Sequence, residues 1–229
     1  MNLIATKILN NKPDYLRNLK YLDEKYNSIF TRKLEKENNE INVLSLFCEM
    51  EFGYLLNEIF DDVIYEPKIK GKTPDWLVIS NNQKIIFEVR KINPIEDDIQ
   101  QRIDLAKKDD YFGLTQTLFS SSRFKFLKHI HKITQKEETY RELIQKENYL
   151  LVICIDVINL HNEFIEDTDL KDYLDFSNKN SLIGENKVFC QNTAGIIGKP
   201  IFPKNIFIKN ENAKYKLNDK NIKLLEELI

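Results

Sequence analysis

Two apolar runs of strand length, joined by a pair of asparagines, constrain the fold of this chain more than any other feature. The runs cover residues 76–79 and 85–89, and Asn81-Asn82 lies between them. Asparagine tolerates the left-handed backbone that a tight hairpin turn requires. We therefore predict a β-hairpin over residues 72–91, with Pro74-Asp75 leading into its first strand.

The second strand of this hairpin carries charged residues among its apolar ones. Because side chains alternate between the two faces of a strand, Glu88 and Arg90 lie on one face and Lys91 on the other. The turn brings Asp75 to the end of the ribbon at which Glu88 lies. Two carboxylates on adjacent strands suit Mg²⁺, which needs few protein ligands and completes its shell with water and phosphate.

The remaining pattern predicts an α/β protein in which helices lie on both sides of a small mixed sheet. Apolar residues recur at helical spacing, which predicts helices over residues 13–36, 42–60, 95–108, 123–146, 170–176 and 218–228. Short apolar segments predict further strands over residues 63–69, 149–157 and 205–209. The glycine-containing segment 195–200 is interpreted as a turn at a strand end.

Composition indicates a globular chain and restricts its partners. The 229 residues suffice for one domain, and 42% hydrophobic residues suffice for its core. The net charge of −2 means that nucleic acid would have to bind a local basic patch. The three cysteines form no CxxC pair, which favours a reducing compartment. Neither a signal peptide nor a run long enough to span a membrane is seen, so we expect a cytoplasmic protein.

The arrangement of the acidic residues resembles the PD-(D/E)xK, or restriction-endonuclease-like, nuclease superfamily. The resemblance rests on Pro74-Asp75, on Glu88-Val89-Arg90 in the next strand and on Glu49 in the preceding helix, and it covers about residues 43–157. It implies an α-β-β-β-α-β core within a single domain. The segments are an N-terminal helical part, the core and a mixed α/β extension, at residues 1–40, 41–160 and 161–229.

The resemblance also implies an activity. It indicates a metal-dependent endonuclease that hydrolyses phosphodiester bonds in nucleic acid, DNA rather than RNA, in defence or repair. Asp75 and Glu88 would hold Mg²⁺ or Mn²⁺, and Glu49 would assist through the metal or a water. Glu51 points about 200° away from Glu49 around the helix, so only one of the two can serve, and we favour Glu49. Nucleases of this fold often dimerise, so a homodimer is one expected state.

Arg90 departs from the family pattern, in which a lysine usually occupies this position. Lysine can help to deprotonate the attacking water, whereas arginine stays protonated and can only stabilise charge. Three alternatives stay open: Arg90 acts electrostatically, a lysine from the next helix replaces it, or the site is catalytically inactive. In the last case the chain is a nucleic-acid-binding or assembly module. A structural interaction protein with an accidental motif is a further alternative.

Lysines at three- and four-residue spacing form a basic stripe on the predicted helix over residues 123–146. The stripe comprises Lys125, Lys128, Lys132 and Lys136. It is either a solvated helix face or a surface that contacts the phosphates of a nucleic acid. His129 and His131 are two residues apart on the same helix and cannot share a metal ion.

Overall fold

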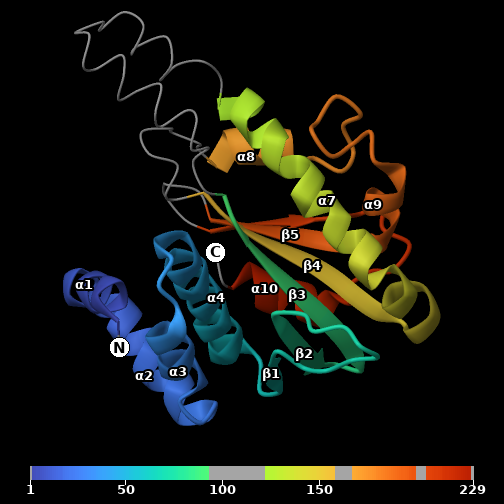
Figure 1. The fold of residues 1–229 in the computed structure, drawn as a ribbon. Helices are drawn as coiled ribbons and strands as arrows, with labels where there is room; N and C mark the ends of the chain where they lie inside the picture. The colour runs from blue at the N-terminus through green and yellow to red at the C-terminus, as the bar shows by residue number, and fades with distance from the viewer. Residues whose placement is uncertain (1, 93–121, 158–166, 200–204, 228–229) are drawn as a thin grey trace, which may run out of the picture.

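The fold is built on one mixed sheet of six strands in sequential order (Figure 1). The structure is a computed structural model that describes residues 2–92, 122–157, 167–199 and 205–227. The strands are β1 (Val63–Tyr65), β2 (Trp76–Ser80), β3 (Gln83–Lys91), β4 (Tyr149–Asp156), β5 (Thr193–Lys199) and β6 (Ile206–Lys209). β1, β2 and β3 are antiparallel, β3, β4 and β5 are parallel, and β6 is antiparallel to β5.

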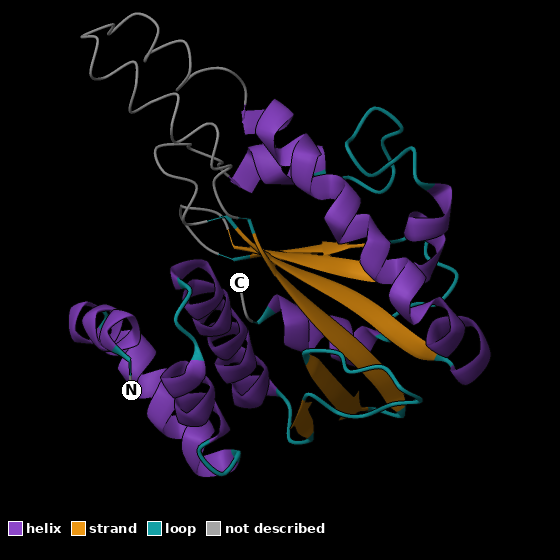
Figure 2. Ribbon diagram, viewed as in Figure 1, coloured by secondary structure: helices purple, strands orange, loops and turns teal. Residues whose placement is uncertain are grey.

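Helices cover both faces of this sheet, so the architecture is three layers of the α/β class (Figures 1 and 2). The first layer contains α1 (Leu3–Asn11), α2 (Pro13–Lys25), α3 (Ile29–Lys36), α4 (Glu40–Ile59) and α10 (Asp219–Glu226). The second layer contains α7 (Ser122–Glu147), α8 (Asp167–Tyr173) and α9 (Lys187–Asn192). No helix in the described ranges is long and apolar enough to span a membrane. The expected α/β class with a mixed sheet is confirmed.

The hairpin predicted from the two asparagines is present. Asn81 and Asn82 both have positive φ, 48° and 61°, as a two-residue type I′ turn requires. β2 and β3 pair in the register that this turn sets, with Ser80 opposite Gln83 and Trp76 opposite Phe87. β4 is buried along its whole length, as expected for a central parallel strand.

The first predicted helix was wrong in its extent. Residues 13–36 form two helices, because Asn27 and Ser28 adopt left-handed backbone conformations with φ of 53° and 57° and break the ladder of hydrogen bonds. Helix α1 was not predicted; the side chain of Asn2 caps it by accepting from the Ala5 backbone N–H at 2.8 Å. The predicted helix over residues 95–108 lies outside the described residues.

The interpretation of segment 195–200 as a turn was also wrong. Gly195 and Gly198 lie inside β5, a buried strand between β4 and β6. An added Cβ at Gly195 would lie 2.7 Å from the ring of Phe207, and one at Gly198 would lie 2.5 Å from Leu170. The glycines therefore serve close packing of β6 and α8 against β5, which a local pattern does not reveal.

The contact between α4 and β2 fixes the two layers that carry the site. Trp76 is fully buried, and its ring lies 4.6 Å from that of Tyr65 and 6.0 Å from that of Phe30. Its indole N–H donates to the backbone carbonyl of Glu49 at 3.1 Å. The tryptophan fits against the helix only because residue 53 is glycine, since a Cβ there would overlap the indole ring.

We predict that Gly53→Ala lowers the free energy of unfolding by about 1–3 kcal/mol, because the added methyl group overpacks the core. The urea-unfolding midpoint measures the loss, and the fluorescence of Trp76, the only tryptophan of the chain, reports the altered contact. Glu58→Ala, at an exposed position of the same helix, is the control and should leave both unchanged. Equal midpoints for the two variants would contradict the packing argument.

Candidate functional site

Asp75 and Glu88 lie on the same face of the hairpin. Trp76 pairs with Phe87, so Asp75 and Glu88 are opposite each other one position further along the ribbon. The backbone N–H of Val89 donates to Asp75 Oδ2 at 2.7 Å, and this bond ties the aspartate to β3. Among the described residues the side chain of Asp75 accepts no other hydrogen bond, so its second carboxylate oxygen is available to a ligand.

Glu88 is 2% exposed and is surrounded by hydrogen-bond donors. Oε1 accepts from Arg90 Nη2 at 2.8 Å and forms an ion pair with Lys136 of α7. Oε2 accepts from the hydroxyl of Tyr140, also on α7, at 2.7 Å. Lys136, a lysine of α7, therefore lies beside Arg90 at this carboxylate.

Glu49 reaches the same end of the sheet from the opposite layer. Its carboxylate accepts from the hydroxyl of Tyr65 at 3.1 Å, and that hydroxyl accepts from Lys33 at 2.7 Å. The same lysine donates to Glu66 at 2.6 Å. This chain of contacts connects α3, β1 and α4, so the N-terminal helices help to position Glu49.

The three carboxylates are electrostatically coupled. Burial, then the charges of Glu88 and Glu49, raise the pKa of Asp75 to about 8. Burial raises the pKa of Glu49 to about 7, with Lys33 and Tyr65 opposing the rise and Glu66 and Glu88 adding to it. Burial also raises the pKa of Glu88, against the influence of Arg90 and Tyr140. Such a cluster favours either bound protons or a bound cation.

Lys91 of β3 and Glu51 of α4 are held in two other ion pairs, of which the first is buried and the second is partly buried. Lys91 and Asp156 are neighbours on β3 and β4, and Lys91 Nζ lies 3.3 Å from Asp156 Oδ2. Glu51 forms an ion pair with Lys199 at the end of β5. The predicted alternation, with Lys91 on the face opposite Arg90, is confirmed. Of the two candidates on α4, Glu49 and Glu51, only Glu49 raises the pKa of Asp75.

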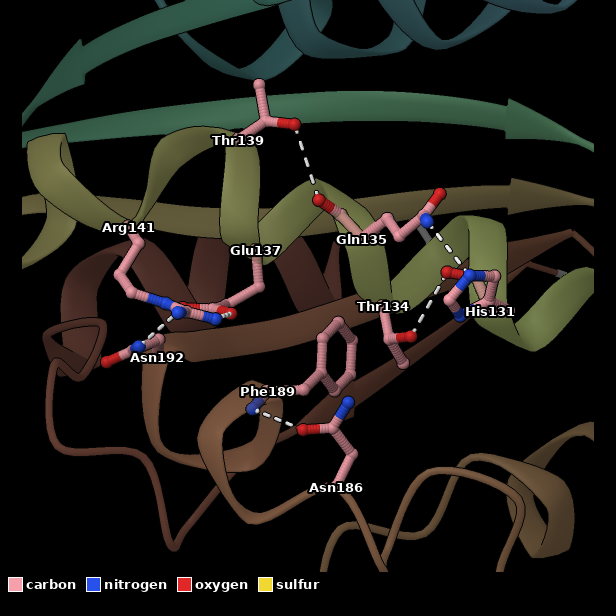
Figure 3. Close-up of polar contacts among 9 residues, drawn as sticks. All are labelled: His131, Thr134, Gln135, Glu137, Thr139, Arg141, Asn186, Phe189 and Asn192. Carbon is pink, nitrogen blue, oxygen red and sulfur yellow. Dashed lines mark hydrogen bonds and ion pairs between the residues drawn. The ribbon is translucent and has the colours of Figure 1, made fainter.

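Glu137, a buried carboxylate on α7, lies beside Arg141 and Asn192 (Figure 3). Glu137 is 1% exposed and accepts two hydrogen bonds from Arg141, at 2.8 and 2.7 Å. It also accepts from the amide of Asn192, where α9 ends, at 2.6 Å. We call these contacts of Glu137 with Arg141 and Asn192 the Glu137 clamp. Lys136 and Tyr140 each precede a member of the clamp by one residue, so the clamp directs them toward β3. Sequence reasoning missed Glu137, Tyr140 and Asn192. The four-residue spacings from Glu137 to Arg141 and from Lys136 to Tyr140 were the signal for the first two.

A cleft of about 510 Å³ lies between α4 and α7 at the carboxyl end of β3, and we call it the α4–α7 cleft. Its lining includes Glu49, Arg90 and Lys132. Lys132 is exposed and belongs to the predicted basic stripe. The side chains of Lys125 and Lys128 are outside the described part of the chain. The cleft therefore adjoins Glu49 and has cationic groups in its wall.

The carboxylates of Asp75, Glu88 and Glu49 determine which metal ion the site could hold. No three His, Cys, Asp or Glu side chains of the described ranges are grouped to hold a metal. Asp75, Glu88 and Glu49 offer oxygen atoms only, and Mg²⁺ commonly uses one or two carboxylates with water and phosphate. Burial is the largest cause of the raised pKa values of Asp75 and Glu49, so a bound cation would stabilise their ionised forms. The residues therefore fit a hard divalent cation.

Comparison of the chain with protein-family models, with curated proteins and with solved structures found no match. The chemistry of the site is therefore inferred from its own side chains. These are three coupled carboxylates, a lysine and a tyrosine on α7, and an arginine on β3.

The raised pKa values predict how stability depends on pH. Folding raises the pKa of Asp75 from 3.8 to about 8, so stability is full below about pH 4 and declines as the pH rises toward 8. Asp75→Asn cannot ionise, so at pH 8 it should be more stable than the wild type by at least about 1 kcal/mol. Urea unfolding at pH 5 and pH 8 measures this. Asp172→Asn, at an exposed position, is the matched control and should follow the wild type.

We predict that Glu137→Ala lowers the free energy of unfolding by about 1–3 kcal/mol, because it leaves the buried amide of Asn192 without an acceptor. Glu142→Ala is the matched control, since Glu142 also pairs with a cation four residues later on α7 but is largely exposed. Glu142→Ala should lower the free energy of unfolding by at most about 0.5 kcal/mol. Chemical denaturation measures the free energy of unfolding of both variants. Equal losses would contradict the stabilising role of the contacts of Glu137 with Arg141 and Asn192.

Proposed function

We propose that this chain is a metal-dependent nuclease that hydrolyses phosphodiester bonds in nucleic acid, DNA rather than RNA, on a restriction-endonuclease-like core. The observation that carries the proposal is the coupling of Glu49, Asp75 and Glu88 at one end of the β2–β3 hairpin. A buried cluster of carboxylates is costly without a cation, and proteins retain such clusters at functional sites. The order of helix, strand and strand that brings the three together agrees with the resemblance.

Asp75 and Glu88 would hold Mg²⁺ or Mn²⁺, with Glu49 as a further ligand or as the acceptor of a water. The bound ion would supply Lewis-acid stabilisation of the charge that develops on the phosphate. Val89 holds one oxygen of Asp75, which directs the other oxygen away from β3. Tyr140 holds one oxygen of Glu88 and so restricts the rotation of that carboxylate.

Lys136 takes the part of the lysine that the motif lacks. It reaches the same oxygen of Glu88 that Arg90 contacts, although it comes from α7 rather than from β3. A lysine amine at this position can orient a water, accept its proton in the neutral form and return a proton as the ammonium. Arg90 stays protonated and stabilises negative charge on the phosphate. This assignment keeps the first of the three alternatives that the sequence left open, and it takes the lysine of the second alternative from α7.

A catalytically inactive binding module is the second candidate function. It is favoured by one observation, that Arg90, Lys136 and Tyr140 already engage both oxygens of Glu88. In such a module Lys136 would replace the metal ion as the partner of Glu88. The protein would then bind nucleic acid without cleaving it.

A cleavage assay tests the nuclease proposal. The wild type should cleave labelled DNA in Mg²⁺ or Mn²⁺, and Asp75→Asn and Lys136→Met should each lower the rate by at least about 100-fold, as expected for loss of a ligand or of a proton-transfer group. Arg90→Lys should retain activity, because it preserves the positive charge. Lys146→Gln, an exposed position on the same helix, is the control and should cleave normally.

The results separate the two candidates. Unchanged cleavage by Asp75→Asn would sink the site assignment. Binding without cleavage on DNA and RNA, with activity appearing only in Arg90→Lys, would establish the inactive module instead. Normal cleavage by Lys136→Met would remove this lysine from the mechanism while leaving the carboxylates in place.

A further inference from the structure

The α4–α7 cleft has a lining that the proposed cleavage chemistry does not use. Its volume of about 510 Å³ falls within the range of sites that hold a small ligand. Aliphatic side chains line it from α4, from α7 and from the end of β3, namely Ile41, Ile133 and Ile92. The α4 side adds the neutral polar residues Asn42 and Ser45. A ligand with a flat apolar body and polar edges matches this combination.

The cationic groups of the cleft lie beside Glu49. Arg90 and Lys132 both line it, and Nε of Arg90 is buried with no hydrogen-bond partner among the described residues. A buried guanidinium N–H without an acceptor is costly, and an anionic group in the cleft would supply one. Phosphate is the anion for which arginine and lysine provide such contacts.

We propose that the α4–α7 cleft binds one unpaired nucleotide of a nucleic-acid strand, so that single-stranded DNA, or duplex DNA with an unpaired nucleotide, is the substrate class. This inference rests on the proposed function, because it places the nucleotide next to the carboxylates that act on its phosphate. The isoleucines contact the faces of the base, and Arg90 and Lys132 contact the phosphate. A paired base cannot fill such a cleft, since its faces are stacked and its edge is used.

The polar residues Asn42 and Ser45 also select among bases. The hydroxyl of Ser45 donates to the carbonyl of Ile41 at 2.9 Å, so its oxygen faces the cleft as an acceptor. The amide nitrogen of Asn42 donates to Glu37 at 3.1 Å, which leaves its carbonyl oxygen as an acceptor. Two acceptors favour a base with an exocyclic amino group, as in adenine and cytosine, over thymine, whose corresponding group is an acceptor.

Binding without cleavage tests this inference. Full-length Asp75→Asn is titrated in EDTA with fluorescein-labelled oligo-dA, oligo-dC, oligo-dT and a dA·dT duplex, and fluorescence anisotropy gives the affinities. Oligo-dA and oligo-dC should bind at least about tenfold more tightly than oligo-dT or the duplex. Free dAMP should compete only weakly, because a strand adds backbone contacts.

Variants in this background locate the binding. Ser45→Leu fills the cleft and should abolish the preference for oligo-dA over the duplex. Asn42→Ala, at an exposed position that leaves the core intact, should weaken oligo-dA binding about fivefold relative to oligo-dT. Lys132→Gln should weaken all strands and reduce the salt dependence. Lys179→Gln, an exposed lysine between α8 and α9, is the control and should change nothing.

Equal affinity for oligo-dA and the duplex, or an unchanged preference in both Ser45→Leu and Asn42→Ala, would overturn the inference. Binding of dAMP as tightly as the strand would also overturn it and make the cleft a site for a free nucleotide. The two proposals fail separately. Cleavage by the wild type with a preference for intact duplex removes only the nucleotide cleft, whereas selective binding without any cleavage removes only the nuclease.

Discussion

The structure depends on one buried carboxylate, Glu88, in the middle of its sheet. An isolated charge at this depth would cost several kcal/mol, so the fold must bring donors to it. Arg90 comes from the same strand, whereas Lys136 and Tyr140 come from α7. The helix can supply them only in one rotation, and the buried contacts of Glu137 with Arg141 and Asn192 set that rotation.

Helix α4, in the other layer, brings the third carboxylate, that of Glu49, to the same end of the sheet. Trp76 packs under α4 against the space left by Gly53 and holds the backbone of Glu49. Lys33 and Tyr65 then orient the carboxylate of Glu49 toward the hairpin. The acidic cluster therefore lies where the two helical layers meet the ends of β2 and β3. Desolvation by both layers is the main reason for the raised pKa values of Asp75 and Glu49.

The features of the fold and site that could be predicted from the sequence are those determined by residues close together in the chain. Two asparagines with positive φ specify the hairpin turn, and strict alternation in β3 places Glu88 and Arg90 together. β5 was not predicted, because its glycines are explained only by contacts with Phe207 and Leu170, which are distant in the sequence or on another element. The break at Asn27 and Ser28 was missed because apolar spacing continued across it.

The sequence by itself determined the hairpin, the central strand β4 and the facing of Asp75, Glu88 and Arg90, since strand alternation and turn chemistry act within a few residues. It also offered Glu49 or Glu51 on α4, and Arg90 or Lys91 on β3, without deciding completely between the members of each pair. Only the tertiary structure decided that Glu51 pairs with Lys199, that Lys91 pairs with Asp156 and that Lys136 reaches Glu88. These choices depend on how helices dock on the sheet, and docking is determined by packing between residues far apart in the chain.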